Sequence, residues 1–476
     1  MILAVDQGTT GTACLLIDEE LRPRGRGYRE VPQHFPRPGW VEHDPEDLWQ
    51  SVLGAAEDAL AAAGLRAADL EAIGITNQRE TTVVWDRRTG RPVHRAIVWQ
   101  DRRTAERCKE LPRDLIRDRT GLVPDPYFSA TKLEWILSEH QAAQLAFGTV
   151  DSWLVWKLTH GELHATDVSN ASRTLLFDLR SLSWDPELLA LFGVPESVLP
   201  ALVSSSGVLG EGELFGARVP IAGIAGDQQA ALFGQACFEP GQAKVTYGTG
   251  SFVLVNAGSE PGSAPEGLVR TVAWRLGDAP AVYALEGSVF VTGAALQWLR
   301  DGLGLLADAA ESERLARSLQ GNDGVYFVPA LTGLGSPHWA PGARGVISGL
   351  SRGTTRAHLA RAALEAIAFQ TTDVLEAMGG PLDVLRADGG GAENSFLVQL
   401  QADLARATVE VPAEKETTAL GAAALAGLAV GTWKTPAEVA AARTVAARYE
   451  PSGDAGEARR LLAEWRLAVR RALLQT

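Results

Sequence analysis

Sulfur-containing residues are scarce in this chain: its 476 residues include three cysteines and two methionines. Cys14, Cys108 and Cys237 lie far apart without a Cys-X-X-Cys spacing, so the sequence indicates neither a disulfide framework nor a zinc site. No apolar run approaches the roughly 18–20 residues that cross a bilayer, and no targeting segment precedes the strand-like residues at the start. We therefore expect a soluble protein of the reducing cytoplasm without a membrane span.

Positive charge is also in short supply, because 44 basic residues face 58 acidic ones and give a net charge of −14. A nucleic-acid partner would require a basic face, so we expect none. No Gly-Lys dipeptide occurs, which excludes a P-loop nucleotide site. The length predicts two domains, and the 46% hydrophobic content is typical of a folded enzyme.

A turn rich in glycine and threonine, Asp6 to Thr12, lies between the apolar runs 1–5 and 13–17 and predicts a hairpin. Small residues let backbone N–H groups and hydroxyls approach phosphate oxygens closely. Asp6, at the strand end, is suited to a hydrated Mg²⁺. Taken alone, the stretch fits an ordinary hairpin equally well.

A similar strand, turn and strand over 243–255 follows about 240 residues later, which indicates an internal duplication of a phosphate-binding unit. Strand-like and helix-like segments alternate throughout and predict the α/β class. We expect strands at 70–76, 220–226 and 384–388, and helices at 44–63, 357–378 and 455–474. Polar residues follow these strands, where ligands of open α/β sheets gather. The predicted domains are 1–241 and 242–476.

Several long motifs point to a known family. They are Asn77 to Thr82 (NQRETT), Ala96 to Gln100 (AIVWQ), Asp125 to Ser129 (DPYFS), Gly223 to Gln229 (GIAGDQQ), Thr246 to Gly250 (TYGTG), and the segment from Gly333 to Gly345. Over nearly its whole length the chain resembles the FGGY carbohydrate kinases of the actin/Hsp70-like ATPase superfamily, and among them those that phosphorylate glycerol. The resemblance implies two ribonuclease-H-like domains with a deep cleft between them, in which ATP and glycerol bind.

The resemblance also implies roles for individual residues. Asp227 would be the catalytic carboxylate, and the substrate site would comprise Arg79, Glu80, Trp99, Tyr127, Asp227, Gln228 and Phe252. Matched polar groups suit a small triol, because a buried hydroxyl without a partner costs roughly 1–3 kcal/mol. Without the family, Arg79 and Glu80 would be read as a surface ion pair. The alternative for Asp227, an aspartate at a strand end, is a helix cap only.

The implied cofactors are ATP and Mg²⁺, with Asp6 and Asp227 oriented toward the metal. The nucleotide site would comprise Thr9, Thr10, Gly11, Thr12, Thr249, Gly293, Gln297, Gly390 and Asn394.

One departure from the family pattern is Ala13, where these kinases commonly carry an arginine that contacts phosphate. A pentulose kinase of the same family and an actin-like ATPase without an acceptor remain alternatives. The family forms homodimers and homotetramers.

Overall fold

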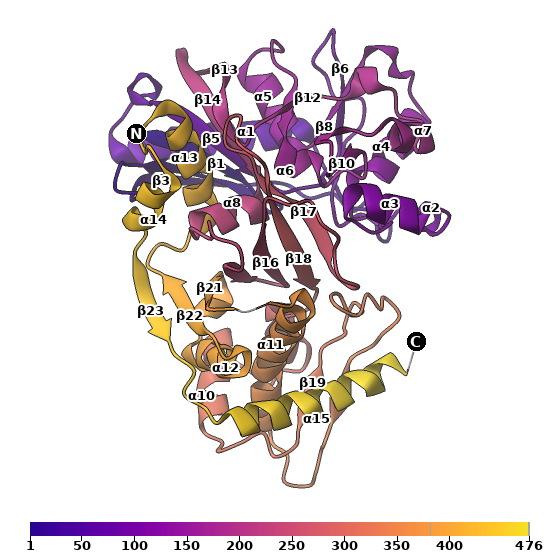
Figure 1. The fold of residues 1–476 in the computed structure, drawn as a ribbon, viewed down its shortest axis with the longest axis vertical. Helices are drawn as coiled ribbons and strands as arrows, with labels where there is room; N and C mark the ends of the chain where they lie inside the picture. Colours follow the sequence, from indigo (N-terminus) through magenta and orange to yellow (C-terminus); the bar gives the residue numbers. More distant parts are fainter. Residues whose placement is uncertain (381, 475–476) are drawn as a thin grey trace.

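A computed structural model describes residues 1–380 and 382–474. The chain forms two lobes stacked along the long axis of the molecule, each built on one large mixed sheet (Figure 1). The first sheet has the spatial order β13 (Ser206–Leu214), β14 (Ala217–Gly226), β5 (Ala72–Asn77), β1 (Ile2–Gln7), β2 (Gly11–Ile17) and β3 (Pro23–Glu30). The second has the order β17 (Val269–Trp274), β18 (Val282–Val289), β16 (Ser251–Gly258), β15 (Ala243–Tyr247), β21 (Val384–Asp388), β22 (Thr408–Pro412) and β23 (Val445–Tyr449). The predicted α/β class is confirmed.

The helices cover these sheets and connect their strands. They are α1 (Pro45–Ala63), α2 (Ala105–Lys109), α3 (Arg113–Thr120), α4 (Ser129–Leu137), α5 (Val150–Leu158), α6 (Val168–Ala171), α7 (Pro186–Leu191), α8 (Asp227–Gly234), α9 (Gly293–Gln297), α10 (Ala309–Arg317), α11 (Arg356–Met378), α12 (Ser395–Ala405), α13 (Thr417–Val430), α14 (Pro436–Ala442) and α15 (Ala455–Leu473). Short strand pairs are β4 (Glu42–His43) with β7 (Ala96–Ile97), β6 (Val83–Asp86) with β8 (Leu145–Gly148), β9 (Ala165–Asp167) with β12 (Ala201–Val203), β10 (Phe177–Asp178) with β11 (Ser183–Trp184), and β19 (Tyr326–Val328) with β20 (Val346–Ser348). Within the described residues, no helix is both long and apolar enough to span a membrane.

Both predicted hairpins are present and occupy corresponding places. Strands β1 and β2 pair antiparallel from Ile2↔Ile17 to Gln7↔Thr12, and β15 and β16 pair from Ala243↔Val255 to Tyr247↔Ser251. Beside each hairpin lie two parallel strands, β5 and β14 in the first sheet and β21 and β22 in the second. The two sheets therefore repeat one topology, as the duplicated sequence pattern predicts.

Helix α13 lies apart from the second sheet, although it comes late in the chain. It packs on the first sheet against β14, β5 and β1, and Figure 1 shows it in gold within the upper lobe. Its residues are small and mostly buried, in the sequence TTALGAAALAGLAV. A Cβ on Gly74 of β5 would come within 2.2 Å of the Ala422 carbonyl oxygen. Glycine thus permits a close contact that any larger residue would prevent.

Helices α8 and α13 follow corresponding strands and pack on one another through a reciprocal pair of glycines. A Cβ on Gly421 of α13 would lie 1.8 Å from the Ala230 carbonyl oxygen of α8. A Cβ on Gly234 of α8 would lie 2.0 Å from the Thr417 carbonyl oxygen of α13. The N-terminal and C-terminal parts of the chain are therefore joined by a contact of backbone against backbone. A chain division at residue 241 stays a prediction, and it would separate α13 from the sheet that it covers.

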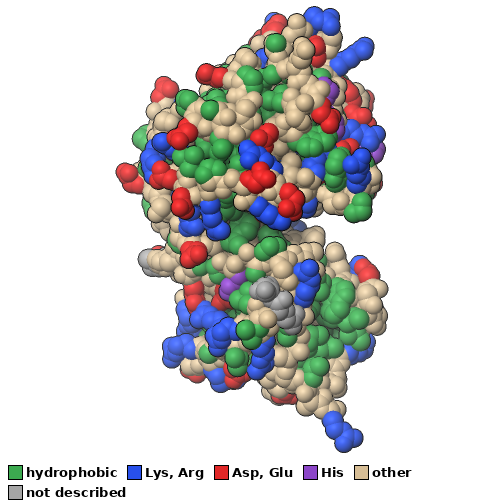
Figure 2. Space-filling view, turned by 90° about the vertical axis from the view of Figure 1, so that its right-hand side faces the viewer, with side chains coloured by type: hydrophobic (Ala, Val, Ile, Leu, Met, Phe, Trp, Pro, Cys, Tyr) green, Lys and Arg blue, Asp and Glu red, His purple; other side chains and the backbone are tan. Residues whose placement is uncertain are grey.

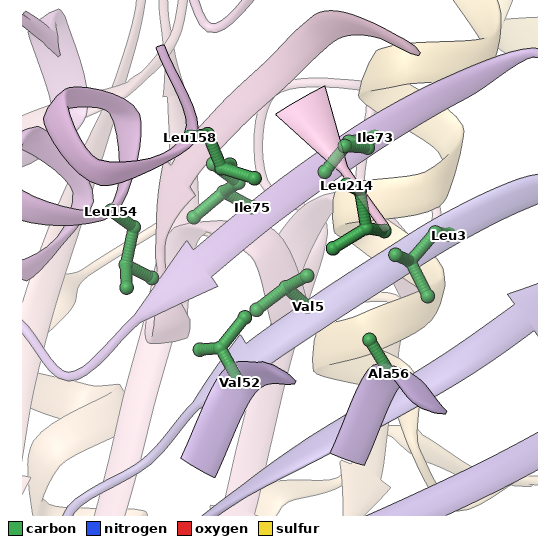
Figure 3. Close-up of a pocket in the computed structure, with 9 residues that line it drawn as sticks. All are labelled: Leu3, Val5, Val52, Ala56, Ile73, Ile75, Leu154, Leu158 and Leu214. Atoms are coloured by element: carbon green, nitrogen blue, oxygen red, sulfur yellow. The ribbon is translucent and has the colours of Figure 1, made fainter. Parts of the chain in front are cut away.

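A small cavity in the core of the first lobe is too small for a substrate. It measures about 10 Å³ and lies between the first sheet, α1 and α5 (Figure 3). Its lining is entirely apolar and comprises Leu3, Val5, Val52, Ala56, Ile73, Ile75, Leu154, Leu158 and Leu214. A space of this size without polar partners does not hold an ordered water. The functional site must be sought elsewhere.

Candidate active site

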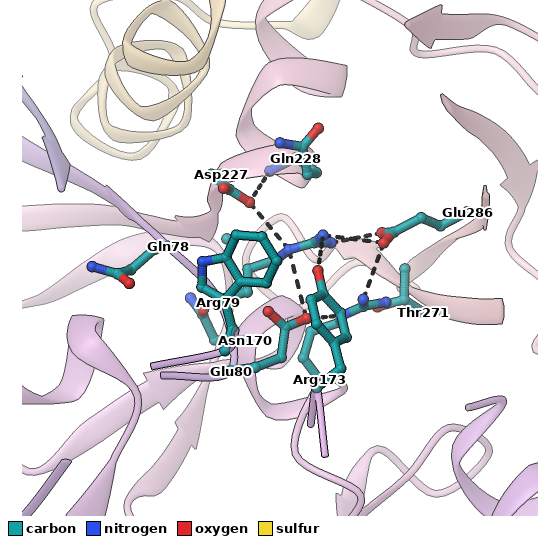
Figure 4. Close-up of polar contacts among 12 residues, drawn as sticks. Gln78, Arg79, Glu80, Asn170, Arg173, Asp227, Gln228, Thr271 and Glu286 are labelled. Atoms are coloured by element: carbon teal, nitrogen blue, oxygen red, sulfur yellow. Dashed lines mark hydrogen bonds and ion pairs between the residues drawn. The ribbon is translucent and has the colours of Figure 1, made fainter. Parts of the chain in front are cut away.

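The polar site contains residues of both lobes, because Arg79 after β5 pairs with Glu286 on β18. Figure 2 shows a notch in the molecular outline between the two lobes. Several members of the site follow strands of the first sheet, and others lie on strands of the second. Figure 4 shows these side chains pointing toward one another from both sides. Most of the charged groups are almost completely buried, which requires partners of opposite charge.

Arg79 is the centre of this cluster. It follows β5 and is 2% exposed, and its guanidinium donates two hydrogen bonds to Glu286 of β18, at 2.6 and 3.1 Å. Further contacts link its Nη1 to Gln229 at 3.2 Å and its Nη2 to the Tyr127 hydroxyl at 3.3 Å. Its Nε lies 3.1 Å from Asp227. The reading of Arg79 as part of a surface pair is therefore wrong.

Glu80 and Arg173 form a second buried pair beside the first. The Arg173 Nε donates to Glu80 at 2.6 Å, and its Nη2 donates to Glu286 at 3.0 Å. Glu80 adopts a backbone φ of 63°, in the left-handed region that non-glycine residues rarely occupy. Such strain is retained where surrounding contacts impose it, often at functional sites. Burial would raise the pKa of Glu286, but Arg173 and Arg79 together lower it to about 2.

Asp227 is the first residue of α8, directly after the buried strand β14. Its backbone follows a buried strand, while its side chain is 31% exposed and can be reached from solvent. The backbone nitrogen of Gln228 donates to the Asp227 Oδ1 at 2.6 Å, and the Arg79 Nε contacts the same oxygen. Gly226 precedes it, and a Cβ there would lie 2.7 Å from the Arg79 side chain. The glycine thus makes room for the arginine.

Gln228 contacts a lysine from the other lobe. The Nζ of Lys244, on β15, donates to the Gln228 side-chain oxygen and to the Thr246 hydroxyl, the latter at 2.9 Å. Lys244 is fully buried. Burial lowers the pKa of Lys244, while the carboxylates of Asp388 and Asp227 favour its charged form.

Aromatic side chains form one wall of the site. Trp99 and Tyr127 meet edge to face, with ring centroids 5.5 Å apart. The Trp99 indole nitrogen donates to the Thr9 hydroxyl at 2.9 Å, which ties this wall to the first turn. Phe252 is partly exposed on β16 and pairs with Ser288 of β18, two residues along from the pair of Leu254 with Glu286.

Between β1 and β2 the first turn leaves Gly8 and Thr9 partly exposed and Thr10 exposed, and the Gly8 nitrogen donates to the Gly11 carbonyl at 2.9 Å. Gln78 supports this turn through bonds to the Gln7 side chain at 3.0 Å and the Gly8 carbonyl at 3.2 Å. Glycine and hydroxyl groups are thus displayed where they could meet an anion.

Two predicted members of the first turn have other surroundings. Thr12 is fully buried within β2, and its hydroxyl shares a 2.6 Å hydrogen bond with Ser51 of α1. The expectation that its hydroxyl faces a phosphate is therefore wrong, because alternation along the strand turns it toward the helix. At Gly11, a Cβ would lie 2.3 Å from the Tyr28 hydroxyl, so glycine there serves the packing of β3. Ala13 is buried in the same strand.

The second turn, 248–250, presents Thr249 at the surface. The Gly293 nitrogen donates to the Gly248 carbonyl at 3.0 Å, and a Cβ on Gly293 would lie 2.6 Å from that oxygen. The start of α9 thus rests directly on the turn, and Gln297 is exposed at the end of this helix.

A third glycine turn follows β21. Gly389 has a φ of 79°, and Gly390 is exposed with open space where a side chain would lie. The Asn394 side chain caps α12 by accepting from the Leu397 nitrogen at 3.0 Å. An exposed glycine at a helix start allows close approach of a ligand.

Asp6 is the penultimate residue of β1 and lies within electrostatic range of Asp227. Burial, together with the carboxylates of Asp227 and Glu416, raises the pKa of Asp6 to about 8. Such mutual repulsion would be relieved by a cation between them. Among the described residues, no group of three or more His, Cys, Asp or Glu side chains is arranged to hold a metal. The pair fits Mg²⁺, which takes one or two carboxylates and keeps several waters.

The structure adds three buried charged residues that the sequence analysis missed, namely Arg173, Lys244 and Glu286. Two of them carried a signal, because Lys244 and Glu286 interrupt the otherwise apolar strands β15 and β18. A charge on a central strand needs a partner. Arg173 lies in a polar stretch and gave no comparable signal.

This geometry agrees with the comparisons. The N-terminal domain of the FGGY family of carbohydrate kinases matches residues 1–234, and its C-terminal domain matches residues 243–430. The chain belongs to the FGGY family of carbohydrate kinases.

Particular relatives lie within this family. The chain is 51% identical to "Glycerol kinase 2" of Thermotoga maritima, covering 99% of this chain and 98% of the relative. It is 53% identical to "Glycerol kinase" of Dechloromonas aromatica, over 99% and 97%. Its fold matches a Plasmodium falciparum glycerol kinase with ADP at a TM-score of 0.93 and 36% identity, covering 99% and 98% of the chains. A xylulose kinase from Rhodospirillum rubrum matches at 0.86 and 26%, covering 98% and 97%.

Proposed function

We propose that this chain is an ATP:glycerol 3-phosphotransferase, which transfers the γ-phosphoryl group of ATP to a terminal hydroxyl of glycerol and releases ADP. The observation that carries the proposal is the partly exposed Asp227 at the start of α8, held by Arg79 beside the Trp99–Tyr127 wall. Relatives named as glycerol kinases, at about half identity over almost the whole chain, support the same acceptor.

Asp227 orients the attacking hydroxyl and takes its proton. Among the described residues, its contacts with Gln228 and Arg79 both fall on Oδ1, which leaves Oδ2 for the acceptor. The ion pair with Arg79 fixes the carboxylate in place before the acceptor binds. Phosphoryl transfer requires mainly such positioning, because the transition state has little covalent bonding for the protein to provide.

Glycerol fits the remaining surfaces. Trp99, Tyr127 and Phe252 offer apolar faces to its carbon atoms, while Glu80 and the Tyr127 hydroxyl offer polar atoms to its hydroxyls. Gln228 lies near the hydroxyl that reacts. Glu286 already occupies both terminal nitrogens of Arg79 in this structure, so the arginine acts on the substrate as part of a fixed ion-pair network. Fixed donors discriminate against acceptors that leave them unpaired.

ATP lies with its phosphates between the two hairpin turns, at Thr9, Thr10 and the backbone of Gly11 on one side and Thr249 on the other. Its adenosine extends along Gly293, Gln297, Gly390 and Asn394. Asp6 and Asp227 are the residues that would hold the water shell of Mg²⁺, and the bound ion would neutralise phosphate charge. The three cysteines are buried free thiols, which suits the cytoplasmic location that we propose. A homodimer or homotetramer is the expected assembly.

An acceptor panel tests the function. Purified protein is given ATP and Mg²⁺, and ADP formation is followed with glycerol, xylulose, ribulose or no acceptor. We expect glycerol to give the fastest turnover and the product to be sn-glycerol 3-phosphate. If a pentulose gave faster turnover, the pentulose would replace glycerol as the proposed substrate. If ATP were hydrolysed without an acceptor as fast as with glycerol, the kinase function would be refuted.

A further inference from the structure

Lys244 is a charged residue of the site to which no role has been assigned. It lies on the central strand β15 of the second sheet, and its side chain is fully buried. Its ammonium group reaches the Gln228 side chain on α8, across the boundary between the lobes, and the Thr246 hydroxyl two residues along its own strand. Both of these partners are uncharged, so simple charge pairing does not explain the contacts.

The chemistry of lysine decides how its partners are oriented. An ammonium group only donates hydrogen bonds, whereas an amide and a hydroxyl can each donate or accept. Lys244 therefore takes the oxygen of the Gln228 amide, and the amide nitrogen must point elsewhere. In the same way, the Thr246 oxygen accepts from Lys244 and keeps its own proton to donate. One buried cation thus directs the donor of the Gln228 amide away from itself and leaves the Thr246 proton available to donate.

These two donors flank the predicted path of the phosphoryl group. Gln228 is adjacent to Asp227, and Thr246 lies two residues before the exposed turn 248–250. Thr246 is partly exposed, while Lys244 itself is not. An anionic oxygen accepts hydrogen bonds and would be repelled by an amide oxygen in the place of the nitrogen.

We propose that Lys244 is a positioning residue that fixes the Gln228 amide and the Thr246 hydroxyl as donors toward the phosphoryl group in transfer. This inference rests on the proposed kinase function and deepens it. The lysine acts through its two partners, so its removal affects the transition state more than the binding of the neutral acceptor. Because Lys244 and Gln228 belong to different lobes, the orientation is complete only when the lobes meet.

The test is a double-mutant cycle in the full-length protein, measured as steady-state kinetics. Lys244→Met should lower kcat about ten- to a hundredfold with a smaller change in the KM for glycerol. Lys244→Arg, which retains only donors, should recover part of the loss. In the Gln228→Leu/Thr246→Val background, Lys244→Met should have little further effect. Lys157→Met, which removes a lysine of α5 paired with Glu46 of α1, serves as the control with normal kcat.

Gln228→Glu tests the donor orientation without altering the lysine. The carboxylate still accepts from Lys244 but has no N–H to offer, so kcat should fall although folding is preserved. Unchanged kcat in Lys244→Met or in Gln228→Glu would overturn the proposal. It would also be overturned if Lys244→Met lowered kcat by the same factor with and without Gln228→Leu/Thr246→Val. The acceptor panel is run first on the unaltered protein, and the cycle uses whichever acceptor supports turnover. Failure of glycerol as acceptor is thereby distinguished from failure of Lys244 as a positioning residue.

Discussion

At the scale of single residues, the site is a set of buried charges that hold one another in place. Arg79 and Arg173 share Glu286, and Asp227 is attached to this network at its exposed edge. Buried charges of this kind cost desolvation energy, and they are tolerated because each has a partner. The chemistry thus depends on residues that do not themselves reach the solvent.

Asp227→Asn is expected to abolish most of the turnover. The amide keeps the shape of the side chain but is a poor proton acceptor, so kcat should fall about 10²- to 10⁴-fold. Titration calorimetry should still detect ADP binding, because the nucleotide contacts lie on the turns. Asp58→Asn, in an exposed pair with Arg29, serves as the control. Turnover at the normal rate would remove Asp227 from the chemistry.

Glu286→Gln is expected to lower the free energy of unfolding by about 3–5 kcal/mol, because two buried guanidinium groups lose their shared counter-charge. Urea unfolding at neutral pH measures this loss. Glu457→Gln, which breaks an exposed pair on α15, should cost less than about 1 kcal/mol. Equal losses in the two variants would contradict the importance of the buried network.

Glu286 also makes the free energy of unfolding depend on pH. The pKa of Glu286 is about 2 in the folded state, below its ordinary value of 4.5, so the ionised group stabilises the fold at pH values above 4.5. This contribution is lost as the pH falls from 4.5 through about 2. Unfolding measured across that range should show a smaller acid destabilisation in Glu286→Gln than in the unaltered protein. An identical pH profile in both proteins would exclude the effect.

The sequence located the residues that carry a motif better than those that support them. Asp227, Arg79 and the two turns were predicted because they belong to long motifs at strand ends. Glu286 and Lys244 were not, because a single charge in an apolar strand reveals a buried group without revealing its partner. Thr12 was misassigned, since sequence proximity to a turn does not tell which face of the strand a side chain occupies.

At the scale of elements, the strands and long helices followed their sequence patterns closely. Helix α1 begins after Asp44, which accepts from the Glu46 nitrogen, and ends at Gly64 with a φ of 67°. Helix α15 occupies 455–473, close to its predicted range, and buries Leu462, Trp465 and Val469. The position of α13 could not be predicted, because an almost uniformly small and apolar helix has no face that identifies its partner.

Gly421→Ala is expected to separate α13 from α8. A Cβ 1.8 Å from the Ala230 carbonyl oxygen cannot be accommodated without moving one helix, at a cost of about 1–3 kcal/mol or more. Because α8 begins with Asp227, kcat should fall together with the melting temperature. Gly207→Ala, where a Cβ meets nothing within 4 Å, is the matched control. A variant with unaltered stability and turnover would show that this glycine contact is dispensable.

At the scale of the whole molecule, the lobes are linked by polar contacts that cross between them, from Arg79 to Glu286 and from Lys244 to Gln228. We expect glycerol and a non-hydrolysable ATP analogue together to favour the closed arrangement and exclude water. Small-angle scattering should show a smaller radius of gyration with both ligands, and ATP hydrolysis should be slow without an acceptor. Equal ATP consumption with and without glycerol would count against closure.

The return of α13 to the first sheet also bears on how the protein is made. A nascent chain that has left the ribosome only as far as residue 241 carries every strand of the first sheet but lacks the helix that covers one face of it. That face, with Gly74 and Gly223 in contact with α13, stays open to water or to chaperones until residues 417–430 have been synthesised. Maturation of the first lobe therefore depends on nearly complete translation of the second.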